Sequence, residues 1–313
     1  MKAVVVSPGR PGALSIGERP EPRQDSDQTL VRVHAVSLNR GEVNRAQSME
    51  AGAGIGWDFA GTVDRPAPNG SGPPAGQPVV GFSPAMEGWA ERVAIDWRSL
   101  AVVPGTIRLE DACTLPVAGL TALYGLERCN RLLADKVLVT GASGGVGWYA
   151  CQLARLMGAR VVAQVRRDDQ VALVQRTGAE SVIVDTDGSR LAGYGPYRLV
   201  LDGVGGPQLG RLLSMLAPDG QAVLYGVSAG RTTGLQIRDL MGTGSGRVNG
   251  FHLYRESEIV SAGRGLERLL YLLESGSLAT LVERTEPWEN VGEVAAALLE
   301  RAYAGKAVLT VTR

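Results

Sequence analysis

The chain has 313 residues, 44% of them hydrophobic, which is enough for a large buried core and about two domains. Lys and Arg number 32 and Asp and Glu number 32, so no net charge favours nucleic acid or a membrane surface as a partner. The three cysteines form no CxxC pair and no apolar run approaches the roughly 18–20 residues of a membrane helix, which together predict a cytoplasmic protein without a disulfide framework.

The first third of the chain is predicted to be β structure. Residues 3–6 and 29–36 are β-branched runs bounded by turn residues, and residues 57–63 and 77–82 are similar. The Pro- and Gly-rich segment 66–74 is a predicted loop, because Pro fixes φ and donates no backbone hydrogen bond. This loop joins two strands of one domain and marks no domain boundary.

Strands and helices alternate from about residue 105, a pattern that predicts a doubly wound parallel sheet. The predicted strands are 136–140, 160–165, 181–184, 198–201 and 221–225, and the predicted helices are 120–133, 148–157, 168–176 and 209–216. After Gly250, predicted helices over 256–274 and 289–303 precede a last strand, 307–311.

A glycine-rich turn between a predicted strand and a predicted helix is the strongest motif of the chain. Small residues let the backbone turn tightly and approach a pyrophosphate, and the N–H groups that begin the helix attract its negative charge. The alternative is a structural turn that is merely rich in Gly, but the strand–turn–helix context favours a dinucleotide site. The predicted cofactor contacts are Ala142, Ser143, Gly144, Gly145, Val146 and Gly147.

The end of the second strand of this domain indicates which dinucleotide binds. An NAD site usually has an acid there, which accepts a hydrogen bond from the ribose 2′-hydroxyl. Here Arg166 and Arg167 occupy the position, and their guanidinium groups suit a 2′-phosphate. A solvated basic turn is the alternative. The sequence therefore predicts NADPH as the cofactor.

Six segments in order along the chain resemble a known family. They are similar to motifs of the zinc-independent quinone oxidoreductases (zeta-crystallin-like) and enoyl reductases of the medium-chain dehydrogenase/reductase superfamily. The segments are 36–42 (VSLNRGE), 56–61 (GWDFAG), 115–122 (LPVAGLTA), 142–147 (ASGGVG), 201–206 (LDGVGG) and 305–309 (GKAVL). The resemblance implies an α/β fold with a GroES-like β-rich catalytic domain, residues 1–107 and 277–313, and a Rossmann NADPH-binding domain, residues 108–276.

Zinc ligands of the superfamily's alcohol dehydrogenases align with residues that rarely bind zinc. Asn39 matches a Cys, Trp57 matches a His, and Val117 lies near the third ligand. The resemblance therefore implies no metal, and without a Lewis acid alcohol oxidation loses its electrostatic support. Hydride transfer to a quinone or to an α,β-unsaturated carbonyl, including a biosynthetic enoyl chain, needs only the cofactor and hydrogen-bond donors. An NADPH-binding structural or regulatory protein without useful turnover is the alternative.

The resemblance also assigns the remaining site residues. Asn39 and Thr121 would line the nicotinamide end, although Asn39 could instead cap a turn and Thr121 could bond its own helix. His252 is the candidate proton donor because imidazole titrates near neutral pH, and a packed or interface His is the alternative. Residues 247–254 would pair with their twin in a homodimer, as in the family. Further cofactor contacts are implied for Val204, Gly226 and Phe251.

Overall fold

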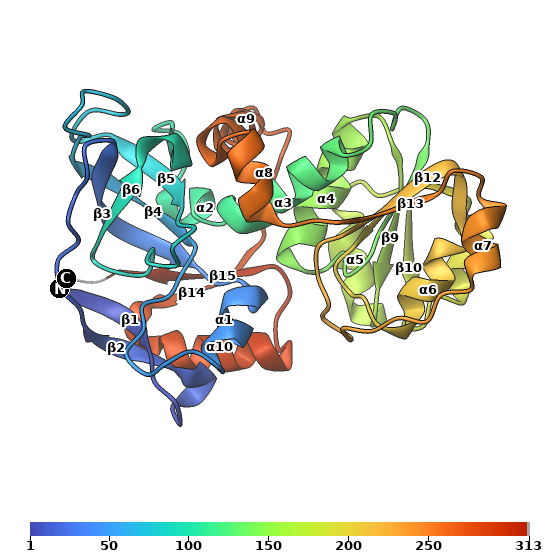
Figure 1. The fold of residues 1–313 in the computed structure, drawn as a ribbon, viewed down its shortest axis with the longest axis horizontal. Coiled ribbons are helices and arrows are strands. Elements are labelled where there is room, and N and C mark those ends of the chain that lie inside the picture. Colours follow the sequence, from blue (N-terminus) through green and yellow to red (C-terminus); the bar gives the residue numbers. More distant parts are fainter. Residues whose placement is uncertain (312–313) are drawn as a thin grey trace. The chain divides into compact units, whose positions relative to one another are not determined.

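The computed structural model describes residues 1–311, which form two compact units (Figure 1). The first unit contains residues 1–120 and the chain from Tyr254 onward, and the second contains Thr121–Leu253. Helix α3 (Pro116–Glu127) and helix α8 (Leu253–Ile259) cross the two borders.

The first unit is built on a seven-stranded sheet with the order β14-β15-β3-β4-β5-β7, and β6 also pairs with β3. Its pairs are antiparallel except β14–β15, and β1 and β2 form a separate antiparallel pair. The strands are β1 (Lys2–Val6), β2 (Leu14–Glu18), β3 (Gln28–Ser37), β4 (Asp58–Arg65), β5 (Pro78–Phe82), β6 (Arg92–Asp96), β7 (Leu100–Val102), β14 (Val282–Pro287) and β15 (Lys306–Thr310). The helices are α1 (Arg40–Ala46), α2 (Leu109–Ala112), α9 (Ala262–Glu274) and α10 (Val291–Glu300), with 3₁₀ turns η1 (Pro11–Ala13), η2 (Trp97–Ser99) and η5 (Trp288–Asn290).

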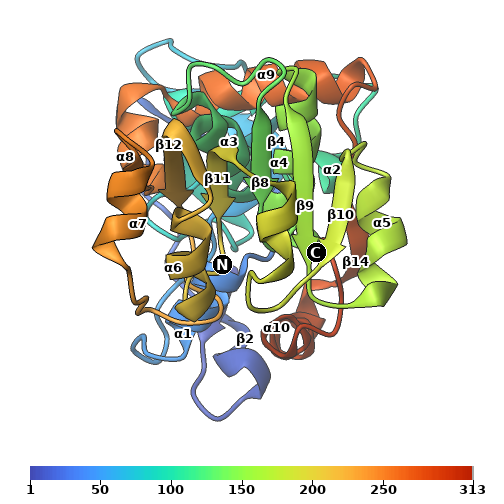
Figure 2. The ribbon, with the colours of Figure 1, turned by 90° about the vertical axis from the view of Figure 1, so that its right-hand side faces the viewer.

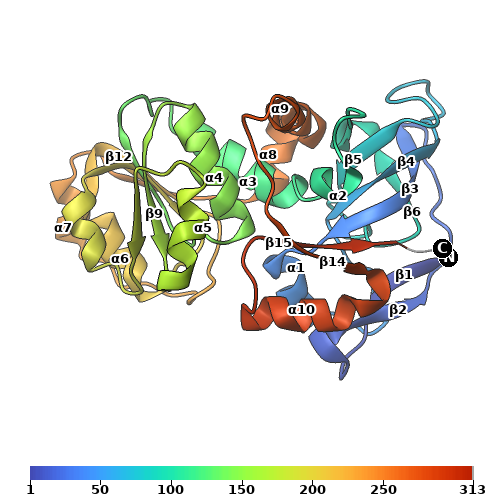
Figure 3. The ribbon, with the colours of Figure 1, turned by 180° about the vertical axis from the view of Figure 1, so that it is seen from behind.

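One hydrophobic core joins the sheet of the first unit to α1 and α10. Its largest members are Phe59, Trp89 and Trp288, each fully buried. Helix α10 packs on α1 and on the β2 side of the unit, as Figure 3 shows from behind. Most residues of β3 and β4 are buried, which explains why their apolar and β-branched runs could be recognised as strands.

The second unit contains the predicted parallel sheet. Its order is β10-β9-β8-β11-β12-β13, and every pair is parallel (Figure 2). This is the strand order of the Rossmann fold, so the fold prediction is confirmed. The strands are β8 (Lys136–Val139), β9 (Arg160–Val165), β10 (Ser181–Val184), β11 (Tyr197–Asp202), β12 (Leu216–Leu224) and β13 (Arg247–Gly250). The helices are α4 (Gly145–Leu156), α5 (Val171–Gln175), α6 (Pro207–Leu213) and α7 (Ile237–Gly242), with 3₁₀ turns η3 (Asp168–Gln170) and η4 (Arg190–Tyr194).

Two segments that the sequence assigns to the cofactor domain, 108–120 and 254–276, belong to the first compact unit. The reason is packing: α2 contacts β3, β4 and β5, and α9 contacts β5 and β7. Gly263 of α9 lies so close to this sheet that an added Cβ would be 2.4 Å from the Leu100 carbonyl oxygen. Among residues 1–311, no helix combines the length and the apolar composition needed to cross a membrane.

Strand β13 leaves one backbone edge of the parallel sheet open, and we predict that it pairs with a second copy. Phe251 donates its N–H to the Leu224 carbonyl of β12. Because successive residues of a strand face alternate sides, the Val248 N–H points to the open edge. Val248→Pro should therefore spare the β12–β13 pairing and shift a homodimer towards monomer or aggregate.

Light scattering at micromolar concentration measures this shift, with Val248→Ala as the matched control that keeps the backbone donor. The wild type and the Ala variant should both be dimers. A monomeric wild type, or a Pro variant that remains fully dimeric, would contradict pairing through β13.

Candidate active site

The glycine-rich turn connects β8 to α4 in the way that a phosphate-binding turn requires. Gly141 has a φ of +60°, a conformation that favours glycine. At Gly147 a Cβ would lie 2.5 Å from the Gly141 carbonyl oxygen and 2.6 Å from the Ala142 Cα. Only glycine therefore lets the first turn of α4 pack on the backbone of the turn.

Helix α4 begins at this turn without a side-chain cap, because its N-cap residue is Gly144. The first N–H groups of a helix have no acceptor within the helix, so those near Gly145, Val146 and Gly147 are suited to an anion. Ala142 is fully buried and its N–H is bonded to the Gln164 carbonyl, and the Gly144 N–H is bonded to the Gly141 carbonyl. The cofactor contacts predicted for the turn remain predictions, and Ala142 would contribute shape instead of a donor.

A buried hydrogen bond that the sequence analysis missed joins β8 to β11 beside the turn. The Thr140 hydroxyl donates to Asp202 Oδ1 at 2.7 Å, and the Gly205 N–H donates to Asp202 Oδ2 at 2.7 Å. Burial raises the pKa of Asp202. Asp202 thus fixes the loop that carries Val204, a predicted cofactor contact. The segment LDGVGG was recognised only by its similarity to the family. Its six residues contain no pattern that would predict a hydrogen bond from Asp202 to the neighbouring strand.

The loops after β11 and β12 lie close together at the same edge of the sheet. A Cβ at Gly226 would be 2.6 Å from the Gly203 carbonyl oxygen, and a Cβ at Gly141 would be 3.5 Å from Val204. Three strand ends, those of β8, β11 and β12, therefore converge here, as expected for a ligand site at the carboxyl ends of parallel strands. Phe251, which follows β13, is partly buried.

The two arginines after β9 are exposed, and each forms a polar contact with a nearby residue. The Gln170 side chain accepts the Arg166 N–H at 3.2 Å. Arg167 Nε lies 2.9 Å from Asp169 Oδ1, in an ion pair whose side chains are more than half exposed. Surface pairs of this kind contribute little, so a phosphate can compete for Arg167.

In the first unit Asn39 belongs to a buried network of charged groups. Its Nδ2 donates to Asp58 Oδ2 at 2.8 Å and to Glu42 Oε1 at 3.0 Å, and its Oδ1 accepts from Lys306 Nζ at 2.5 Å. Lys306 also lies 3.2 Å from Asp58 and donates to the Leu38 carbonyl. Both hydrogens of the Asn39 amide are thus engaged. This network favours a positioning role for Asn39 over direct contact with the nicotinamide carboxamide.

Backbone donors complete the network of Asn39, Glu42, Asp58 and Lys306. Trp57 N–H donates to Glu42 Oε2 at 2.7 Å, and Val117 N–H donates to Asp58 Oδ1 at 2.9 Å. Glu42, Asp58 and Lys306 are at most 3% exposed, so two carboxyl groups share one buried ammonium group. Desolvation and then the nearby Asp58 raise the pKa of Glu42 from 4.5 to about 8.

The raised pKa of Glu42 predicts that stability falls as pH rises between about 4.5 and 8. In this window the folded chain holds a proton that the unfolded chain has lost, so each pH unit lowers the free energy of unfolding by up to about 1.4 kcal/mol. Glu42→Gln should reduce this slope and leave the part that comes from Asp58, whose pKa burial also raises, while Glu50→Gln, at an exposed position, should keep the whole slope. Urea denaturation across the pH range measures it, and equal slopes in all three proteins would contradict a protonated Glu42.

Trp57 has an aromatic environment. Its Nε1 donates to the Tyr254 hydroxyl at 2.5 Å, and the two rings meet edge to face with centroids 6.2 Å apart. Phe82 meets the Tyr254 ring at 5.7 Å. Trp57 and Tyr254 are partly exposed and Phe82 is buried beneath Tyr254, so the two outer rings form an apolar surface with one hydroxyl group. Neither Phe82 nor Tyr254 was predicted to be a site residue.

The other two predicted catalytic residues, Thr121 and His252, differ in their exposure to solvent. Thr121 lies in α3 and is 5% exposed. His252 is exposed, and it precedes α8 by one residue. Their catalytic roles stay predictions.

Comparison with known proteins relates the chain to a family. The family model for zinc-binding dehydrogenases matches residues 145–266. Acryloyl-coenzyme A reductase of Sulfurisphaera tokodaii is 26% identical over 346 residues, covering 99% of both chains. A phenolphthiocerol/phthiocerol polyketide synthase subunit of Mycobacterium tuberculosis is 31% identical over 232 residues, covering 70% of this chain. The chain spans only 10% of the length of that polyketide synthase subunit.

Two solved structures share the fold over nearly their whole length. A mycobacterial protein complexed with NADPH has a TM-score of 0.89 and 25% identity, covering 99% of this chain and 100% of that one. Quinone oxidoreductase of Escherichia coli, complexed with NADPH, has a TM-score of 0.88 and 24% identity at the same coverage. The chain belongs to the medium-chain dehydrogenase/reductase superfamily, in the branch of quinone oxidoreductases and enoyl reductases.

In this oxidoreductase the residues that align with zinc ligands form hydrogen bonds with other parts of the protein. Asn39 is bonded to Glu42, Asp58 and Lys306, and the Trp57 indole N–H is bonded to Tyr254. Val117 contributes its backbone N–H to Asp58. Within residues 1–311 no group of three or more His, Cys, Asp or Glu side chains is placed to hold a metal ion.

Proposed function

We propose that this protein is an NADPH-dependent oxidoreductase that reduces a quinone or an α,β-unsaturated carbonyl compound without a catalytic metal ion. The observation that carries the proposal is the glycine turn, whose backbone packs so closely that side chains are excluded at Gly147. The NADPH complexes of two proteins with the same fold support it. NADPH would supply the hydride.

The residues of the second unit fit NADPH part by part. The start of α4 at Gly144–Gly147 would hold the pyrophosphate, with the helix dipole favouring its charge. Arg166 and Arg167, both exposed, would hold the 2′-phosphate. Val204, Gly226 and Phe251 would border the nicotinamide half, at the strand ends that Asp202 helps to fix.

The first unit would position the substrate. The surface formed by Trp57 and Tyr254, which Phe82 supports from below, suits a planar conjugated ring or enone, since it offers two aromatic rings and one hydroxyl group. The Tyr254 hydroxyl, which accepts from the Trp57 indole, is a second candidate beside His252 for a hydrogen bond to a substrate oxygen that becomes an enolate.

The residues that align with the zinc ligands of alcohol dehydrogenases support a reaction without a metal ion. The Asn39 carbonyl oxygen accepts from an ammonium group that lies beside it, and a cation at that oxygen would be repelled by Lys306. Neither Trp57 nor Val117 offers a side-chain lone pair of the kind that zinc binds.

A substrate panel tests the proposal and the metal prediction together. We expect NADPH oxidation with a small quinone, a simple enone or an enoyl thioester, and the relatives named for acryloyl-coenzyme A and polyketide synthesis make the thioester the first arm to assay. Activity should survive exhaustive chelation, and elemental analysis should find no stoichiometric zinc. Tight NADPH binding without turnover in any arm would support a binding protein instead. Zinc lost together with activity would overturn the metal-free mechanism.

A further inference from the structure

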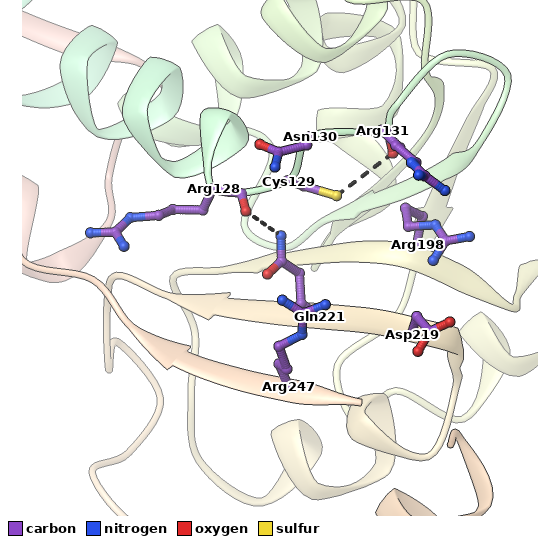
Figure 4. A pocket seen from close by; sticks show the side chains of 8 residues that line it. All are labelled: Arg128, Cys129, Asn130, Arg131, Arg198, Asp219, Gln221 and Arg247. Atoms are coloured by element: carbon purple, nitrogen blue, oxygen red, sulfur yellow. Dashed lines mark hydrogen bonds between the residues drawn. The ribbon is translucent and has the colours of Figure 1, made fainter. Parts of the chain in front are cut away.

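A cavity of about 360 Å³ lies in the second unit, where β11 and β13 begin. This is the amino-terminal edge of the parallel sheet, whereas the glycine turn follows the carboxyl end of β8. The cavity is therefore separate from the predicted cofactor site. Its lining residues come from the loop after α3 and from β11, β12 and β13: Arg128, Cys129, Asn130, Arg131, Arg198, Asp219, Gln221 and Arg247 (Figure 4).

The lining is strongly basic in a chain whose charges balance. Four arginines and one aspartate line the cavity, whereas the whole chain has equal numbers of basic and acidic residues. Figure 4 shows that the Arg128 side chain points away from Arg131 and Arg198. Arg131, Arg198 and Arg247 therefore carry the positive charge of the cavity, and Asp219 opposes it only in part.

Two of these three guanidinium groups have no counter-ion in the part of the chain that the structure describes. Arg198 Nε lies 3.1 Å from Asp135, and its NH1 donates to the Pro218 carbonyl. In contrast, the Arg131 and Arg247 side chains make no ion pair or hydrogen bond with any residue in 1–311. Like charges gathered without partners raise the free energy of the folded state, and a bound anion would offset this.

A buried amide holds the cavity in shape. Gln221 is 7% exposed, and its Nε2 donates to the Arg128 carbonyl at 2.7 Å. Its Oε1 accepts from Asn249 Nδ2 at 3.2 Å. The loop after α3 is thus tied to β12 and β13, and the arginines project from a fixed backbone. Such preorganisation lowers the entropic cost of binding a ligand.

We propose that this cavity binds a small phosphate-bearing anion. Guanidinium groups form paired, charge-assisted hydrogen bonds with phosphate oxygens, and three of them around one cavity favour two phosphate groups or more. The volume lies at the lower end of the range for small-molecule sites. No aromatic side chain lines it, so the anionic groups and not a stacked base would provide recognition.

Cys129 provides a direct measurement of occupancy. It lies in the cavity and is partly exposed, whereas Cys113 and Cys151 are fully buried. In the NADPH-loaded protein, pyrophosphate should slow alkylation of Cys129 by iodoacetamide, measured by mass spectrometry. Arg131→Gln with Arg247→Gln should raise the half-protecting concentration at least about tenfold, because hydrogen bonds to charged groups are lost. Arg160→Gln with Arg264→Gln removes the same charge outside the cavity and should leave protection unchanged.

Three outcomes would contradict specific anion binding in this cavity. They are no protection of the wild type by millimolar pyrophosphate, equal protection by sodium chloride at the same ionic strength, and unchanged protection in the Arg131/Arg247 variant. Citrate serves as a further arm, and stronger protection by citrate than by pyrophosphate would reject a phosphate ligand. Labelling does not depend on turnover, so a failure here is distinguishable from a failure of the proposed redox activity.

Discussion

Lys306→Met should lower the free energy of unfolding by about 3–5 kcal/mol, the usual cost of leaving a buried charge without its partner. Lys306 is 3% exposed, and it is the ammonium group that faces Asp58 and the Asn39 carbonyl oxygen. Without it Asp58 keeps only the Asn39 amide and the Val117 N–H as donors. Urea denaturation at neutral pH measures the loss.

Two variants separate the charge from other effects of this substitution. Lys2→Met changes an exposed lysine and should stay within about 0.5 kcal/mol of the wild type. Asp58→Asn combined with Lys306→Met removes both charges and should be more stable than Lys306→Met alone, because the uncompensated carboxylate is gone. A Lys306→Met protein as stable as Lys2→Met would show that Asp58 does not depend on this ion pair.

Local sequence patterns were sufficient to predict the parallel sheet. The predicted strands 160–165 and 181–184 coincide with β9 and β10. Strands of this kind are short apolar runs between turn residues, so each can be recognised from its own residues. The turn from Gly141 to Gly147 was predictable for the same reason, because its tight geometry restricts side-chain size within seven consecutive residues.

The buried network around Asn39 was not predictable from local patterns. Asn39 and Lys306 are 267 positions apart, and Trp57 and Tyr254 are 197 apart. Lys306 was noted only as part of GKAVL, a short segment that resembles the family. The residues next to it in the sequence do not indicate that its side chain is buried. The contact of Lys306 with Asn39 arises from the antiparallel pairing of β15 with β3, which places Lys306 beside the residues that follow β3.

The predicted boundaries of some elements differ from those in the structure. One example is a helix whose apolar spacing continues past the point where a new helix begins. The predicted helix 256–274 is divided into α8 and α9, because the Ser261 hydroxyl accepts the Arg264 N–H and begins a new helix. The same region was predicted to extend β13 to residue 254, but the strand ends at Gly250. β14 was not predicted, because its residues alternate between partly buried and exposed and include several charges.

Arg166→Ala combined with Arg167→Ala should lower the preference for NADPH over NADH, measured as the ratio of kcat/KM values, on the order of a hundredfold. Each guanidinium would contact the 2′-phosphate that NADH lacks. Both side chains are exposed, so solvent screens the contacts and the lower end of the range for charged hydrogen bonds applies. The preference of the wild type should also decrease as salt is added.

Asp169→Asn should act in the opposite direction. Arg167 Nε lies 2.9 Å from Asp169 Oδ1, so the carboxylate competes with a phosphate for this guanidinium and adds a negative charge beside it. Removing that charge should increase the preference for NADPH. Arg160→Ala with Arg211→Ala removes two other exposed, paired arginines of the same unit and should leave the ratio unchanged. If the Arg166/Arg167 variant keeps the wild-type ratio, the 2′-phosphate is bound elsewhere, and the turn after β9 is a solvated basic surface.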